Sequence, residues 1–86
     1  MKELKMFTMA SCPHCHNAYA WMDELRAENE KYKQIELIMV DETEEPEYAA
    51  KFDYYYVPTF YVDGVKVHEG IASLEIMRNI FDSVLE

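Results

Sequence analysis

The sequence has little of what several protein classes require. Its 86 residues include two glycines and three prolines, which excludes collagen-like and low-complexity chains. Its apolar runs are short, such as Leu37–Val40, whereas a membrane-spanning helix needs about 18 apolar residues. Basic residues are also few: 8 Lys and Arg stand against 17 Asp and Glu, a net charge of −9. Because nucleic acids and anionic membranes are bound mainly through positive charge, we expect neither as a partner.

Hydrophobic residues are plentiful by contrast, at 50% of the chain, and aromatic residues make up 14%. We therefore expect a single folded domain, residues 1–86, and a monomer. The apolar stretch near the N-terminus is too brief for a secretory signal, so the expected compartment is the cytoplasm. In that compartment two closely spaced cysteines are more often catalytic or metal-binding than structural.

Apolar patterns predict alternating strands and helices. Residues 5–9, preceded by Leu4, predict a short buried strand, which runs into a helix opened by Ser11 or Cys12 with Pro13 in its first turn. This helix carries an apolar stripe at helical spacing: Ala18, Trp21, Met22 and Leu25. Residues 35–40 are almost entirely apolar, which predicts a second strand at the centre of a parallel sheet. Trp21 and the methionines of these elements are expected in the core.

The second half predicts a short helix, a hairpin and a final helix. Residues 41–52 begin with an acidic stretch that suits the first turn of a helix. Asp63-Gly64, between two apolar strands, is a strong hairpin signal. A last helix follows Ser73 as its N-cap. Its apolar stripe is Leu74, Met77, Ile80, Phe81 and Val84.

The predicted order is therefore β-α-β-α-β-β-α. The helix between the first two strands requires them to be parallel, whereas the last two strands form an antiparallel hairpin. These elements predict an α/β fold in which a four-stranded mixed sheet is flanked by three helices.

The two cysteines lie where the first strand meets the first helix, as Cys12-Pro13-His14-Cys15. Two intervening residues in a first helical turn bring two sulfurs within disulfide reach. Unpaired N–H groups at a helix N-terminus favour a thiolate, and a protonated His14 would add to that effect. We expect Cys12 to be the nucleophile and Cys15 the buried resolving thiol, with His14 tuning the reactivity of Cys12.

Together with Val57-Pro58, which opens the hairpin before the last helix, this motif resembles the thioredoxin superfamily in its compact glutaredoxin-like form. The resemblance implies a thioredoxin-like fold and a cis peptide bond before Pro58, which would pack against the cysteines. It also implies that the Val57 backbone pairs with a bound substrate in the manner of an added strand. Tyr56, directly before this pair, would then lie beside the substrate groove.

Other positions concern the reaction partner. The pair Pro13-His14 is similar to the centre of DsbA-type oxidases, which implies that both residues tune Cys12 by stabilising its thiolate and that the disulfide is more oxidising than that of thioredoxins. Glutaredoxins that use glutathione commonly have a Lys three residues before the first cysteine, and this chain has Met9 there. Thioredoxins usually have a buried acidic residue six residues before the first cysteine, and this chain has Met6 there. The missing Lys argues against a dependence on glutathione. The resemblance implies a thiol–disulfide oxidoreductase without a separate cofactor, acting on disulfides of proteins or small thiols and recycled by a reductase that the sequence does not identify.

Two other readings use the same cysteines. Cys12, Cys15 and His16 match the pattern for covalent haem attachment, although the surrounding strands suit an α/β sheet better than a small cytochrome. Thiolates are also good ligands for copper(I) or zinc, so a small metal carrier is the alternative function. Four convincing ligands for a structural zinc are missing, since His68 is distant in sequence, and we predict no metal site.

Overall fold

The computed structural model describes residues 1–86, and its elements follow the predicted order. They are β1 (Leu4–Thr8), α1 (Pro13–Glu28), the 3-10 helix η1 (Glu30–Gln34), β2 (Leu37–Asp41), α2 (Pro46–Ala49), β3 (Thr59–Val62), β4 (Val65–Glu69) and α3 (Leu74–Leu85). The expected α/β fold, a four-stranded mixed sheet with three α-helices, is confirmed. None of the helices is long and apolar enough to cross a membrane.

The sheet has the order β2-β1-β3-β4, with β1 parallel to β2 and antiparallel to β3. The prediction that residues 35–40 form a central strand is wrong, because β2 begins at Leu37 and lies at an edge. Ile38 and Met39 are 43% and 49% exposed. The prediction that Met39 lies in the core is therefore wrong. An edge strand pairs on one side only, so part of its apolar sequence is exposed to solvent. The hydrophobicity of a sequence alone does not distinguish an edge strand from a central strand.

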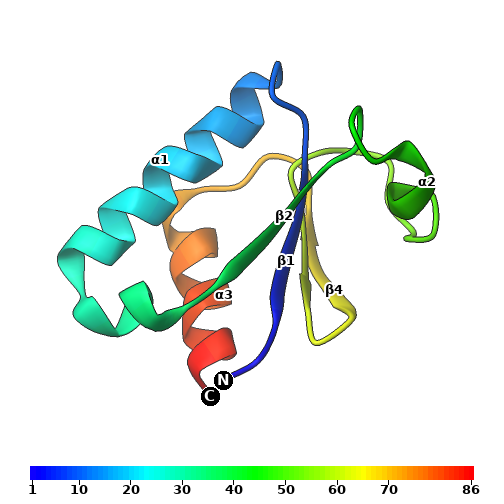
Figure 1. The fold of residues 1–86 in the computed structure, drawn as a ribbon. Helices are drawn as coiled ribbons and strands as arrows, with labels where there is room; N and C mark the ends of the chain where they lie inside the picture. The colour runs from blue at the N-terminus through cyan, green and yellow to red at the C-terminus, as the bar shows by residue number, and fades with distance from the viewer.

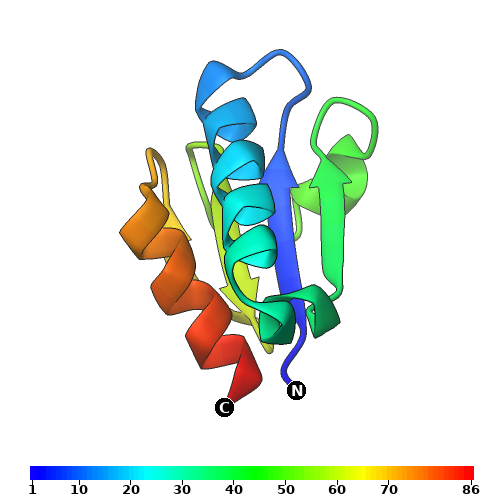
Figure 2. The same ribbon diagram turned by 90° about the vertical axis from the view of Figure 1, so that its left-hand side faces the viewer.

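Helices α1 and α3 lie on one face of the sheet, and α2 lies on the other (Figure 1, Figure 2). Between the sheet and the helix pair is the main core, a cluster of 15 buried residues. It takes alternate residues of the strands, such as Leu4 and Met6 of β1, together with the apolar stripes of α1 and α3. Trp21 was expected inside this core but is only partly buried against it.

The opposite face of the sheet carries a smaller group of rings, called here the aromatic cluster. Phe7 of β1 is its centre and is fully buried. The ring centroids of Phe52, Tyr54 and Tyr61 lie 4.7, 4.8 and 5.6 Å from that of Phe7, distances at which aromatic pairs attract one another. The side chains of β1 thus alternate between the two faces, as a strand requires.

The ends of the helices follow local rules. Ser73 caps α3 as predicted, since its hydroxyl accepts a hydrogen bond from the amide of Ile76 at 3.0 Å. Helix α2 is shorter than the predicted 41–52, because it starts at Pro46 and ends at Ala49. Beyond its C-cap residue the next two backbone amides donate to carbonyls three residues earlier, as in a 3-10 turn. The acidic residues before Pro46 form turns instead of helix.

The hairpin between β3 and β4 turns at Asp63-Gly64, as predicted. Both residues have a positive φ, 49° and 80°, which is the backbone that a tight two-residue hairpin turn requires. At the same end of the molecule the two termini lie close together, because the amide of Lys2 donates to the carbonyl of Val84 at 2.9 Å (Figure 1). The N-terminus of α1 lies at the other end of the sheet (Figure 1).

Candidate active site

Cys12 is the N-cap residue of α1, the residue that joins the loop after β1 to the helix. Its backbone is extended (φ −86°, ψ 116°), and Pro13 follows at the first helical position, where its missing N–H is no loss. The carbonyl of Cys12 accepts hydrogen bonds from the amides of Cys15 and His16, at 3.1 and 3.2 Å. No side chain caps the helix, so the thiol of Cys12 lies at the positive end of the helix dipole, which favours negative charge.

The two thiols differ in exposure. Cys12 is partly buried at the margin of the main core, whereas Cys15, one turn further into α1, is fully buried. Burial raises the pKa of the Cys15 thiol, and the neighbouring Cys12 sulfur adds to this effect. The Thr8 side chain and the Met9 amide act in the opposite direction, because both interact with the Cys15 sulfur and favour its thiolate. The structure therefore makes the Cys12 thiol accessible and keeps the Cys15 thiol, one helical turn away, protected from solvent.

The segment before β3 approaches the cysteines from the side. The peptide bond between Val57 and Pro58 is cis, as the resemblance implied. The Sγ atom of Cys12 lies 3.9 Å from the carbonyl oxygen of Val57, a long contact in which the thiol is the donor. Pro58 is buried, and its carbonyl accepts a hydrogen bond from the amide of Gly70 at 2.8 Å. The Val57 backbone is thus held next to the partly exposed sulfur.

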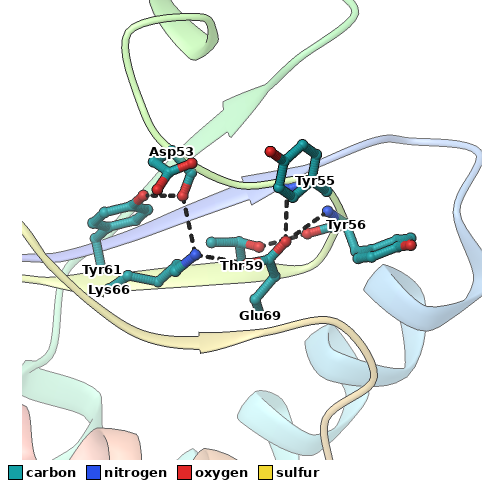
Figure 3. Close-up of polar contacts among 7 residues, drawn as sticks. All are labelled: Asp53, Tyr55, Tyr56, Thr59, Tyr61, Lys66 and Glu69. Carbon is teal, nitrogen blue, oxygen red and sulfur yellow. Dashed lines mark hydrogen bonds and ion pairs between the residues drawn. The ribbon is translucent and has the colours of Figure 1, made fainter.

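The residues before Val57 form a loop, residues 53–56, which we call the tyrosine loop. Tyr55 and Tyr56 are 86% and 69% exposed, and their rings point in different directions (Figure 3). Glu69, at the end of β4, accepts hydrogen bonds from the amides of both tyrosines, at 2.6 and 3.0 Å, and pairs with Lys66 at 2.7 Å (Figure 3). One carboxylate therefore fixes the backbone that carries both rings.

The same contacts change the acidity of that carboxylate. The ion pair with Lys66 and the two amide hydrogen bonds stabilise the charged form, and they lower the pKa of Glu69 to about 2. Sequence reasoning missed Glu69 because its two hydrogen bonds to the amides of Tyr55 and Tyr56 depend on how β4 lies beside the loop, and only the pair with Lys66 is local. No local motif around Glu69 indicates them.

The remaining predicted residues are more loosely placed. Pro13 and His14 are exposed, and the side chain of His14 makes no hydrogen bond or ion pair. His16 is exposed too; its ring nitrogen contacts the Ala10 carbonyl and its ring stacks on Tyr19 with centroids 5.7 Å apart. His68 lies on β4, and its ring nitrogen is 2.9 Å from the Ile71 carbonyl oxygen. The structure thus brings Cys12, Cys15 and the Val57-Pro58 segment together, while the three histidines remain dispersed around them.

Two further polar residues adjoin the buried thiol, and sequence reasoning missed both. The hydroxyl of Thr8, the last residue of β1, is hydrogen-bonded to the phenol of Tyr19 on α1. Tyr19 follows Cys15 by four residues, the spacing that places two side chains on the same face of a helix. That spacing was the available signal, although it does not distinguish a tyrosine that hydrogen-bonds to β1 from a core aromatic residue.

A family model described as a thioredoxin domain matches residues 2–82, which is nearly the whole chain. The chain belongs to the thioredoxin domain family. No curated protein matches its sequence.

Solved structures of thioredoxins share the fold at low sequence identity. The oxidised thioredoxin of Plasmodium falciparum is 20% identical, with a TM-score of 0.73 over 99% of this chain and 82% of its own. A mutant thioredoxin from Halobacterium salinarum is 21% identical, with a TM-score of 0.70 over 99% and 75%. The thioredoxin of Fasciola hepatica is 24% identical, with a TM-score of 0.70 over 95% and 79%. A thioredoxin-like domain is thus built here from a sequence that has diverged widely from these three.

Proposed function

We propose that the protein is a thiol–disulfide oxidoreductase in which Cys12 is the nucleophile and Cys15 the resolving thiol. The observation that carries this proposal is the unequal burial of the two cysteines on one helical turn. A partly exposed sulfur at a helix N-terminus can meet a substrate, while a fully buried one is kept from solvent oxidants until the mixed disulfide forms. Membership of the thioredoxin domain family supports the same reaction class.

The reaction follows from this placement. The Cys12 thiolate attacks one sulfur of a substrate disulfide, and the electron pair of the broken S–S bond leaves with the other sulfur, which takes up a proton. Cys15 then loses its proton and attacks the Cys12 sulfur, and the second substrate sulfur leaves as a thiolate. Once that thiolate takes up a proton from water, the substrate has gained two electrons and two protons, and Cys12 and Cys15 are joined as a disulfide. The same steps in reverse donate a disulfide to a substrate.

Substrate binding would use the segment beside Cys12. The Val57 backbone lies next to the thiol and is available to pair with an extended peptide. The exposed Tyr56 ring, directly before it, offers an apolar surface for residues that flank the disulfide. The net charge of −9 favours neutral or basic protein substrates over anionic ones such as glutathione. The recycling reductase, the cytoplasmic compartment and the monomeric state stay predictions.

The glutaredoxin-like subtype and the oxidising character of the Pro-His pair are finer proposals. If exposed Pro13 and His14 stabilise the thiolate of Cys12, the reduced form is favoured and the disulfide becomes a stronger oxidant. We expect a reduction potential more positive than about −270 mV, the value of thioredoxin. Equilibration of the protein in glutathione buffers, followed by mass spectrometry, measures this potential and detects any glutathione adduct on Cys12. A potential as negative as that of thioredoxin would refute the oxidising proposal alone.

Trapping tests the roles of the two cysteines. A Cys15→Ser variant is expected to accumulate a mixed disulfide with a peptide disulfide substrate, whereas a Cys12→Ser variant is expected to form none and to lose reductase activity. The double variant is the control for adducts elsewhere, since the chain has no further cysteine. Full activity in Cys12→Ser, or failure of Cys15→Ser to trap, would refute the assignment.

Metal carriage remains the alternative use of the pair. No group of three or more His, Cys, Asp or Glu side chains is placed to hold a metal ion, so Cys12 and Cys15 alone would have to bind it. Thiol titration with and without a chelator separates the two functions. If fewer thiols react before the chelator is added than after it, the thiols were bound to metal, and the protein would be a metal carrier.

A further inference from the structure

The β3–β4 hairpin holds the tyrosine loop through two charged side chains, Glu69 and Lys66 (Figure 3). The Oε2 atom of Glu69 accepts hydrogen bonds from the amides of Tyr55 and Tyr56, at 2.6 and 3.0 Å. Its Oε1 atom lies 2.7 Å from the Nζ atom of Lys66, and that ammonium also donates to the carbonyl of Asp53 at 3.2 Å. The Glu69–Lys66 pair therefore binds three peptide groups of this short loop.

Two hydroxyls of β3 hold the ends of the same loop. The Tyr61 hydroxyl donates to the carbonyl of Asp53 at 2.7 Å, and the Thr59 hydroxyl donates to the carbonyl of Tyr56 at 2.5 Å (Figure 3). Both side chains are buried, so these two contacts join the loop to the interior of the domain. The loop backbone is thus bound to side chains of β3 and β4 from its first residue to its last.

The next residue, Val57, has free peptide groups by contrast. Its amide makes no hydrogen bond within the chain, and its carbonyl has only the long contact of 3.9 Å with the Cys12 thiol. Both groups are therefore available to pair with an extended peptide. On one side Val57 is joined to the buried Pro58, and on the other to the tyrosine loop. The position of that loop decides how the two groups are presented.

Polar contacts matter at the tip of the loop because apolar packing there is sparse. Tyr55 and Tyr56 are 86% and 69% exposed, so their rings do little to order the backbone that carries them. Hydrogen bonds to an ionised carboxylate are stronger than those between neutral groups. With a pKa lowered to about 2, Glu69 stays charged at neutral pH and keeps these stronger bonds.

We propose that Glu69 and Lys66 are positioning residues for peptide substrates, which hold the tyrosine loop so that the free peptide groups of Val57 can pair with an extended chain. This inference rests on the proposed function and adds a substrate class to it: disulfides within a peptide chain, as opposed to small disulfides. The hydrogen bonds of the Glu69–Lys66 pair go to the loop or to each other, and none goes to a cysteine. We therefore expect the pair to act on substrate binding and to leave the reactivity of Cys12 unchanged.

Single turnovers of the reduced protein with two probes separate binding from thiol chemistry. The small probe is a chromogenic aromatic disulfide. The large probe is an uncharged pair of peptides joined by a disulfide, with about four residues on each side of each cysteine and a fluorophore and quencher that separate on reduction. Glu69→Ala is expected to raise the half-saturating concentration of the large probe about tenfold, which corresponds to a loop in the binding conformation about one tenth of the time. Its limiting rate, and the rate with the small probe, are expected to stay at the wild-type values.

Variants of Lys66 distinguish positioning from charge. Lys66→Met is expected to raise the same half-saturating concentration about threefold, less than Glu69→Ala because Glu69 still accepts from both tyrosine amides. Lys66→Arg, which keeps a positive donor, is expected to restore binding. Glu69→Ala and Lys66→Met change the net charge in opposite directions, so a purely electrostatic effect would have opposite signs in the two variants. The proposed positioning gives the same sign in both.

Glu28→Ala is the matched control. Glu28 is a carboxylate in an ion pair with Arg78 at 2.5 Å, at the end of α1 opposite to Cys12. Its loss changes the net charge as Glu69→Ala does and is expected to leave both probes at wild-type values. An effect in Glu28→Ala as large as that in Glu69→Ala would refute the positioning role. If Glu69→Ala does not fold in urea denaturation tests, Lys66→Met and Lys66→Arg make the same comparison.

The remaining outcomes separate this inference from the proposed function. A wild-type protein that reduces neither probe would refute the function itself. Reduction of the small probe alone would refute the peptide substrate class and leave the function intact. Unchanged binding of the large probe in Glu69→Ala and Lys66→Met would refute the positioning role. Equal slowing of both probes would refute it too, because that result indicates a general disturbance of the site.

Discussion

The two faces of the sheet are held by different means. The face under α1 and α3 rests on a closed cluster of 15 buried residues that includes Cys15. The face under α2 has four buried residues, and the partly buried side chains of Tyr48, Phe52, Tyr54 and Val57 pack against them. The cysteines that carry the proposed chemistry thus lie in the larger core or at its margin, whereas Val57, which would pair with a substrate, packs against both clusters.

This difference suggests a division of labour. Electron transfer between two sulfurs depends on their spacing, which a helix and a dense core keep constant. Binding of varied substrates depends on a surface that can adjust, and the tyrosine loop is fixed mainly by polar contacts from Glu69 and by Tyr54, whose phenol donates to Glu42 at 2.8 Å. Substitutions on the two faces should therefore fail in different ways.

The largest contrast should be in stability. Phe81 of α3 is fully buried, and its ring packs against Tyr32 with centroids 5.4 Å apart. Phe81→Ala is expected to lower the free energy of unfolding by about 3–5 kcal/mol, measured by urea denaturation. Phe52→Ala, in the aromatic cluster, should cost less than about 2 kcal/mol, because that side chain is only partly buried. Equal losses in the two variants would show that the faces do not differ in this respect.

A smaller contrast should appear in substrate binding. Tyr56→Ala is expected to raise KM for a peptide disulfide about two- to tenfold, the range for loss of one aromatic contact, with little change in kcat. Tyr55→Ala is the matched control in the same loop, one residue further from Val57. If Tyr55→Ala raises KM as much as Tyr56→Ala, the effect belongs to the loop in general. If neither changes it, the loop does not contact the substrate.

The smallest effect should be a pH-dependent loosening of the loop. The folded pKa of Glu69, about 2, lies below its ordinary value of 4.5, so the contribution of this carboxylate is fully present above about pH 4.5. It is lost as pH falls toward 2, and the amides of Tyr55 and Tyr56 should then exchange faster with solvent, as measured by NMR. A Glu69→Gln variant should lack this transition, because its side chain does not titrate in that range. The same transition in the variant would assign it to another carboxylate.

Much of the fold could be predicted because its signals are local. Asp63-Gly64 marks the hairpin by backbone conformation alone, and Ser73 marks the start of α3 by a hydrogen bond within one turn. Cys12 and Cys15 could be assigned opposite exposures because they lie in the first turn of a helix whose apolar stripe was visible. These features depend on residues less than five positions apart.

What could not be predicted depends on pairing across the chain. The apolar residues of β2 fit a central strand as well as an edge strand, and the choice is made by β1 and β3, which pair with each other. Glu69 reaches Tyr55 across 14 positions, and Tyr19 reaches Thr8 from a helix to a strand. Periodicity indicates which side chains share a face and says nothing of which polar partner meets them there.

The meeting of the two chain ends has a practical consequence. Because Lys2 and Val84 are joined by a backbone hydrogen bond at the end of the sheet away from Cys12, a tether or an immobilised tag at either terminus would leave the thiols facing outward (Figure 1). A short peptide bridging the termini would also permit circular permutation, with new ends opened at the Asp63-Gly64 hairpin. The domain could then be attached to a surface or inserted into a host protein without blocking the side from which a substrate reaches Cys12.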